Sequence, residues 1–160
     1  MLINIALAFV LPWIFGTLYL HPRNRRLLPL VGTAFCILAI VINELGSYYG
    51  FWKLRTSLEN EALEALPFNL GVYPVLASYM IFLIQRIGKP HFFIFLIALL
   101  TTFLEGTYMY TDRVIYGNGW NLGWTFFSYW IPYSVIYLYY RYLVSLRLLH
   151  YKKKRSKFAQ

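Results

Sequence analysis

Long apolar runs separated by short polar segments dominate the chain, and all but the fourth run are uncharged. Five such runs cover residues 2–20, 27–43, 67–85, 92–110 and 122–140. A helix of about 17–20 residues is about 25–30 Å long, which matches the hydrocarbon core of a bilayer. The runs are apolar on all sides rather than alternating, so the pattern predicts spanning helices and disfavours a β-barrel.

Composition favours a membrane location for these helices. Of the 160 residues, 59% are hydrophobic and 13% are charged, whereas a soluble domain carries about 25% charged residues. A soluble fold of this composition would have to cover its surface with large apolar side chains. We therefore predict an all-α fold, a five-helix transmembrane bundle that forms a single transmembrane domain over residues 1–145, in a multi-pass protein of the cell membrane.

Basic residues are distributed unevenly between the two sides of such a bundle. Twelve of the 15 Lys and Arg residues fall in the first loop, the third loop and the segment that follows the fifth run, and three fall in the other loops. The positive-inside rule then predicts the N-terminus outside and the C-terminus in the cytoplasm.

Residues 146–160 are predicted to form a basic cytoplasmic tail. Its basic side chains are expected to contact anionic lipid head groups. The residues assigned to this contact are Lys152, Lys153, Lys154, Arg155 and Lys157. The tail offers no folded basic face, so no nucleic-acid partner is predicted.

The acidic residues fall mainly on the outer side. There, Thr56-Ser57-Leu58-Glu59 has the spacing of a helix capping box. It predicts a short helix that lies on the outer membrane surface and is ended by Pro67. A solvated connector is the alternative interpretation of the same segment.

Glu105 is the one ionisable residue well inside an apolar run. It shares a helical face with Thr101 and Tyr108, at i, i+4 and i+7. Carboxylates inside a membrane are costly and are functional candidates for that reason. The alternative is a hydrogen-bonded glutamic acid, or one near enough to the interface to be wetted.

Several further polar residues are predicted at a similar depth near the outer surface. We hypothesise that they line an outward-facing polar pocket between the second and fifth spans. The residues of this predicted pocket are Asn43, Glu44, Asn69, Glu105, Tyr108 and Asn121. In addition, Pro74 and Pro132 each free a backbone carbonyl that neighbouring helices must satisfy.

The sequence lacks the motifs of several chemistries. The single cysteine, Cys36, lies in an apolar run and has no partner for a disulfide or a metal site. No glycine-rich phosphate loop or nucleophile elbow is present. We therefore predict no metal, no cofactor and no catalytic residues.

The order of features resembles a family of small multi-pass membrane proteins of endospore-forming Gram-positive bacteria, whose function is unassigned. The likeness rests on Asn69-Leu70-Gly71-Val72-Tyr73-Pro74 with Gln85, and on the segments 120–124 and 128–133. It covers about residues 27–145. It implies fold and location only, and it carries over no functional residues.

These observations lead to three hypotheses about function. The first is a non-enzymatic, membrane-embedded binding or accessory protein that contacts membrane lipids and a membrane-protein partner or further copies of itself. The second is a small oligomeric transporter or channel protomer in which Glu105 responds to protons or cations. The third is an enzyme acting on a lipid, with Glu105 and Glu44 as acid and base.

Overall fold

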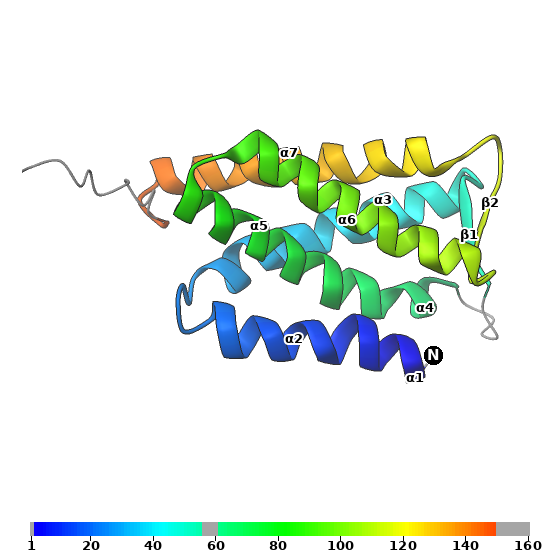
Figure 1. The fold of residues 1–160 in the computed structure, drawn as a ribbon, viewed down its shortest axis with the longest axis horizontal. Coiled ribbons are helices and arrows are strands. Elements are labelled where there is room, and N and C mark those ends of the chain that lie inside the picture. Colours follow the sequence, from blue (N-terminus) through cyan, green and yellow to red (C-terminus); the bar gives the residue numbers. More distant parts are fainter. Residues whose placement is uncertain (1, 56–60, 150–160) are drawn as a thin grey trace, which may run out of the picture.

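The computed structural model describes residues 2–55 and 61–149, and this part of the chain is mostly helical (Figure 1). The predicted capping box at 56–59 and the five predicted lipid-contact residues of the tail lie outside the described residues. The two exceptions to the helical pattern are short strands in the connectors.

Continuous helices match the five apolar runs, and three of them contain π-helical turns, labelled η. The first comprises α1 (Leu2–Asn4), η1 (Ile5–Val10), α2 (Leu11–Phe15) and η2 (Gly16–Leu20). The second joins η3 (Leu28–Gly32) to α3 (Thr33–Tyr48), and the third joins α4 (Glu61–Pro67), η4 (Phe68–Val72) and α5 (Tyr73–Ile87). The last two are α6 (Pro90–Tyr110) and α7 (Leu122–Ser145).

Local sequence signals account for the ends of the later helices. Gly88 ends α5 in the left-handed region at φ 79°, and Pro90 then opens α6 at a first-turn position where a proline costs no hydrogen bond. Asn121 begins α7 as its N-cap, since its side-chain oxygen accepts from the amides of Gly123 and Trp124.

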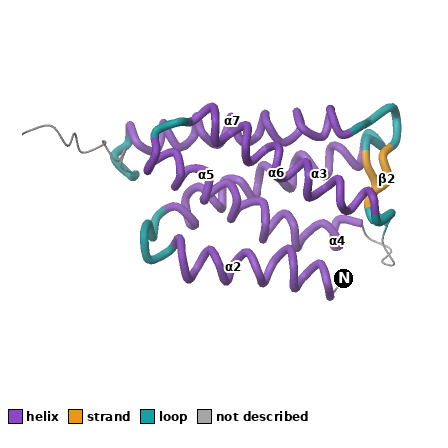
Figure 2. The backbone as a smooth tube through the Cα atoms, viewed as in Figure 1, coloured by secondary structure: helices purple, strands orange, loops and turns teal. Residues whose placement is uncertain are grey.

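Consecutive helices run in opposite directions, so the loops gather at two ends of the bundle (Figure 1). The described N-terminal residues lie at the end that carries β1 (Trp52–Leu54) and β2 (Val114–Tyr116), which we call the strand end. The two strands pair antiparallel, with Trp52 opposite Tyr116 (Figure 2). The loop 21–27, the turn at 88–89 and the end of α7 lie at the opposite end, which we call the basic end.

α5 is the central helix, because it packs against α3, α6 and α7 as well as the N-terminal helix. Its side chains Met80, Ile81 and Ile84 are fully buried. Beside them, the ring of Tyr133 on α7 stacks on Phe35 of α3 with a centroid distance of 4.9 Å. This apolar core occupies the middle of the bundle and its basic end.

Three helices are long and apolar enough to cross a membrane: Leu28–Tyr48, Ala62–Ile87 and Pro90–Tyr110. A shorter apolar helix covers Ile5–Leu20. By length and composition, these helices indicate a membrane protein.

One local prediction is wrong. Pro67 does not end a short surface helix, because α4 continues through it into η4 and α5. Pro67 has φ −57°, a helical value, and it lies inside the helix, where it has no N–H for the Leu63 carbonyl and the π-helical turn η4 follows directly. The third helix therefore starts earlier than the apolar run, and it carries Glu64 into a buried position with 7% of its surface exposed.

Candidate functional site

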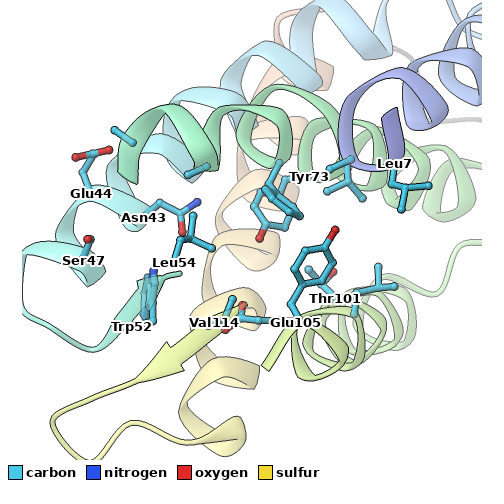
Figure 3. A pocket seen from close by; sticks show the side chains of 17 residues that line it. Leu7, Asn43, Glu44, Ser47, Trp52, Leu54, Tyr73, Thr101, Glu105 and Val114 are labelled. Carbon is cyan, nitrogen blue, oxygen red and sulfur yellow. The ribbon is translucent and has the colours of Figure 1, made fainter. Parts of the chain in front are cut away.

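A cavity of about 700 Å³ lies at the strand end of the bundle (Figure 3). Its wall comes from the first four helices and from both strands. The polar lining residues are Asn43, Glu44, Ser47, Tyr73, Thr101, Glu105 and Tyr108. The rest of the lining is apolar or aromatic: Leu7, Ala8, Trp52, Leu54, Ala62, Ala65, Phe68, Val72, Leu104 and Val114. Glu44 and Ser47 are exposed, so the cavity reaches the surface near the end of α3.

The Glu105 carboxylate projects from α6 into the cavity wall. Each of its two oxygens accepts a hydrogen bond from a phenolic hydroxyl. Tyr116 of β2 donates to Oε1 at 2.7 Å, and Tyr129 of α7 donates to Oε2. Glu105 thus joins three elements that are distant in the sequence. The two hydroxyls provide the hydrogen bonds that water would give an exposed carboxylate.

This hydrogen-bond network continues beyond Glu105 in two directions. On one side, Trp120 Nε1 donates to Thr125 Oγ1 at 2.9 Å, and Thr125 donates to the Tyr116 hydroxyl at 2.8 Å. On the other side, the hydroxyls of Tyr73 and Tyr129 are 2.9 Å apart. Because the single proton of Tyr129 is used on Glu105, Tyr73 is the donor in that pair.

The strand pair positions Tyr116, and its residues Trp52, Leu54 and Val114 form part of the cavity wall. Burial raises the pKa of the Tyr116 phenol, and the negative charge of Glu105 raises it further. Trp52, opposite Tyr116 in the ladder, lies flat on Gly46 of α3, where an added Cβ would be 1.9 Å from the indole. A glycine at position 46 therefore allows β1 to pack against the end of α3.

A second polar cluster, which we call the Asn4 cluster, ties the N-terminal helix to the cavity wall. Asn4 donates to Glu64 Oε1 at 2.7 Å and is buried with it. Its own Oδ1 lies 3.4 Å from both the Tyr108 hydroxyl and Nη1 of Arg113. The cluster links the first helix, α4, α6 and the segment before β2.

The six residues of the predicted pocket have different positions. Asn43, Glu44, Glu105 and Tyr108 line the cavity. Asn69 is 2% exposed and accepts a hydrogen bond from the side chain of Asn43, so it supports the wall from behind. Asn121 does not line the cavity, since its side chain is used in capping α7. The predicted position between the second and fifth spans also differs, because the first helix lines the cavity and α7 does not.

Sequence reasoning missed the strand residues and the Asn4 cluster. Trp52, Leu54 and Val114 lie in connectors, and three-residue strands give too short an alternation to recognise. Asn4 is one polar residue in an apolar run, and Glu64 was assigned to a surface segment. The sequence signal that could have drawn attention to both is a polar residue within a few positions of the end of an apolar run.

The arrangement does not offer a metal centre within residues 2–55 and 61–149, where no group of three or more His, Cys, Asp or Glu side chains is close enough to hold an ion. Glu44 and Glu105 project from different helices, α3 and α6 (Figure 3). The chemistry that the cavity does offer is an apolar, aromatic space with two carboxylates.

Comparison with protein-family models, with curated proteins and with solved structures finds no match for this chain.

Proposed function

We propose that the chain is a multi-pass protein of the cell membrane with five spanning helices, the N-terminus outside and the C-terminus in the cytoplasm. We further propose that it is a binding protein without catalytic activity, and that its ligand enters the cavity from outside. The cavity of about 700 Å³ beside Glu105 is the single observation that carries this proposal. Its volume is in the range typical of small-molecule sites, and its mostly apolar lining is typical of them as well.

The distribution of charge along the bundle supports this orientation. The described basic residues of the basic end are Arg23, Arg25, Arg26, Arg86, Lys89, Arg141 and Arg147. The strand end holds three described basic residues, Lys53, Arg55 and Arg113, together with the carboxylates Glu44, Glu64 and Asp112. By the positive-inside rule, the basic end faces the cytoplasm, and the cavity then opens to the outside.

Cysteine labelling in intact cells tests this proposal without knowledge of the ligand. Leu104 and Phe103 are neighbours on α6; Leu104 is 40% exposed and lines the cavity, whereas Phe103 is 69% exposed and does not line it. In a Cys36→Ala background, a membrane-impermeant maleimide should label Leu104→Cys from outside. Phe103→Cys, surrounded by acyl chains, should stay unlabelled, because a thiol reacts as the thiolate and needs water.

The basic end provides the complementary measurement. Lys89→Cys should be labelled only after the cells are permeabilised. Equal labelling of positions 103 and 104, or labelling of position 89 in intact cells, would overturn the proposed orientation and cavity.

A transporter or channel is a second candidate, and the position of Glu105 favours it. This carboxylate is reached from the cavity and is bonded to both α7 and β2. Intramembrane acids of this kind occur on ion and proton pathways. Proteoliposomes of the purified chain should then show a pH-dependent flux that Glu105→Gln abolishes, whereas a binding protein shows none.

A further inference from the structure

We infer that the ligand of this cavity is an apolar organic cation, such as a quaternary ammonium or phosphonium group on a hydrocarbon or aromatic body. The inference rests on the proposed function, since it names the ligand class of the same cavity. Charge, aromatic side chains and hydrogen-bonding capacity each point to it.

The charge of the lining is entirely negative. Glu44 and Glu105 line the cavity, and the described lining residues include no Lys or Arg. The side chains that hydrogen-bond the Glu105 carboxylate are the neutral hydroxyls of Tyr116 and Tyr129. A partly desolvated carboxylate with neutral partners attracts a cation more strongly than an exposed one, because the local dielectric constant is lower.

Arg113 is the basic residue of the Asn4 cluster next to this wall. Its guanidinium bonds Asn4 and lies 5.8 Å from the centroid of the Tyr108 ring, and Arg113 is not part of the lining. This contact shows that the Tyr108 ring already accepts a cation nearby. Because Arg113 is not in the lining, the carboxylates of Glu44 and Glu105 have no basic side chain beside them in the described cavity wall.

Aromatic rings provide the second argument. Trp52, Phe68, Tyr73 and Tyr108 line the cavity, and the rings of Phe68 and Tyr108 meet edge to face at 5.2 Å. The faces of such rings carry negative potential and attract alkylammonium groups, with Trp the strongest of them. Anions gain nothing comparable from this surface, because the ring faces carry negative potential.

Hydrogen-bonding capacity separates an apolar cation from a metal ion or a polar amine. Both oxygens of Glu105 already accept a phenolic hydrogen bond, and the described residues include no group of three or more His, Cys, Asp or Glu side chains that could hold a metal ion. A metal ion needs several free oxygen or nitrogen ligands. A cation without N–H groups needs only proximity to charge and an apolar wall, which Leu7, Leu54, Val72 and Leu104 supply.

The test uses two probes of nearly equal size and shape and opposite charge. Equilibrium dialysis would measure the binding of tetraphenylphosphonium and of tetraphenylborate to the full chain in lipid nanodiscs, with empty nanodiscs as the blank for partition into lipid. We expect saturable binding of tetraphenylphosphonium at one site per chain, and none of tetraphenylborate. Quenching of Trp fluorescence should follow the same curve, since Trp52 lines the cavity.

Carboxylate variants locate the site. Glu105→Gln should weaken the binding of tetraphenylphosphonium by about ten-fold, and Glu44→Gln, at the exposed mouth, by a smaller factor. Asp112→Asn is the matched control, because Asp112 is an exposed acid at the same end that does not line the cavity. Since Glu44 is exposed, its variant should fold normally and so keeps the test valid if Glu105→Gln does not fold.

The outcomes separate the inference from the proposed function. Saturable binding of tetraphenylborate, or an equal loss in Asp112→Asn and Glu44→Gln, would overturn the cationic ligand while leaving a binding cavity in place. Absence of saturable binding of both probes would also overturn it. In each case the labelling of Leu104→Cys tests separately whether the cavity is open to water from outside.

Discussion

The basic end and the strand end of the bundle are built from the same helices but in different ways. Toward the basic end, large side chains fill the space between helices, and Ile81, Ile84 and Tyr140 are fully buried. At the strand end, the helices enclose a cavity, and polar side chains such as Glu105 and Asn43 join them by hydrogen bonds. Side-chain packing therefore stabilises the basic end. The strand end is packed less densely and contains space for a ligand.

The largest expected effect comes from the same kind of truncation made at both ends. Ile84→Ala leaves a void in the packed core and should lower the free energy of unfolding by about 3 kcal/mol. Leu104 is 40% exposed and lines the cavity, so Leu104→Ala removes few packing contacts and should cost less than about 1 kcal/mol. Unfolding in mixed micelles of mild and denaturing detergent measures both. Equal losses would show that the strand end is as tightly packed as the basic end.

A glycine contact tests how the N-terminal helix joins the bundle. A Cβ on Gly71 would lie 2.0 Å from the Ala8 carbonyl oxygen and 2.5 Å from the Phe9 Cα, which are backbone atoms that cannot move aside. Gly71→Ala should therefore cost about 2 kcal/mol by forcing the two helices apart.

Gly16→Ala is the matched control for this substitution. Gly16 also lies between the N-terminal helix and the third helix, but the nearest atoms to its added Cβ are methyl groups at 3.5 Å or more. Its thermal unfolding in detergent should differ little from that of the parent chain. A stable Gly71→Ala variant would mean that the N-terminal helix is only loosely attached.

The helices could be predicted from the sequence because long apolar runs are bounded by charged and turn-forming residues. The run at 92–110 became α6 (Pro90–Tyr110), and the charged and turn-forming residues at each end marked its limits. The run at 67–85 was placed less well. Apolarity does not mark the beginning of a helix whose first turns are polar, and Glu64 lies in such a turn, buried against Asn4.

The candidate site could be predicted only in part. The depth of Asn43, Glu44, Glu105 and Tyr108 follows from their positions along the runs. The hydrogen-bond partners of Glu105 could not be predicted, because Tyr116 lies in a connector and Tyr129 is one of several tyrosines of α7. The rotation of α7 and the pairing of two three-residue strands decide these contacts, and both depend on the packed fold.

A smaller effect is expected where a proline removes a helix hydrogen bond. Pro74 has no N–H for the carbonyl of Leu70, and Trp13 Nε1 donates to that oxygen at 2.8 Å. A neighbouring helix thus supplies the donor for the carbonyl that Pro74 frees, as the sequence predicts. Trp13→Phe should cost about 1 kcal/mol, because the freed carbonyl loses this donor.

A double variant distinguishes this hydrogen bond from the packing of the indole. In the Trp13→Phe background, Pro74→Ala restores a backbone N–H that can reach the Leu70 carbonyl. Part of the lost stability should then return, as measured by the same thermal unfolding. An additive loss in the double variant would show that the ring of Trp13, not its N–H, stabilises the contact between the N-terminal helix and the third helix.

The smallest expected effect is a pH dependence at the strand end. Because burial raises the pKa of Tyr116, its phenol keeps the proton in the folded chain while the unfolded chain releases it above about pH 10. Its contribution to stability is therefore complete below about pH 10 and is lost as the pH rises toward the higher folded value. The midpoint of thermal unfolding should fall more steeply with pH in the parent chain than in Tyr116→Phe. If the two slopes agree, the ionisation of Tyr116 is not coupled to folding.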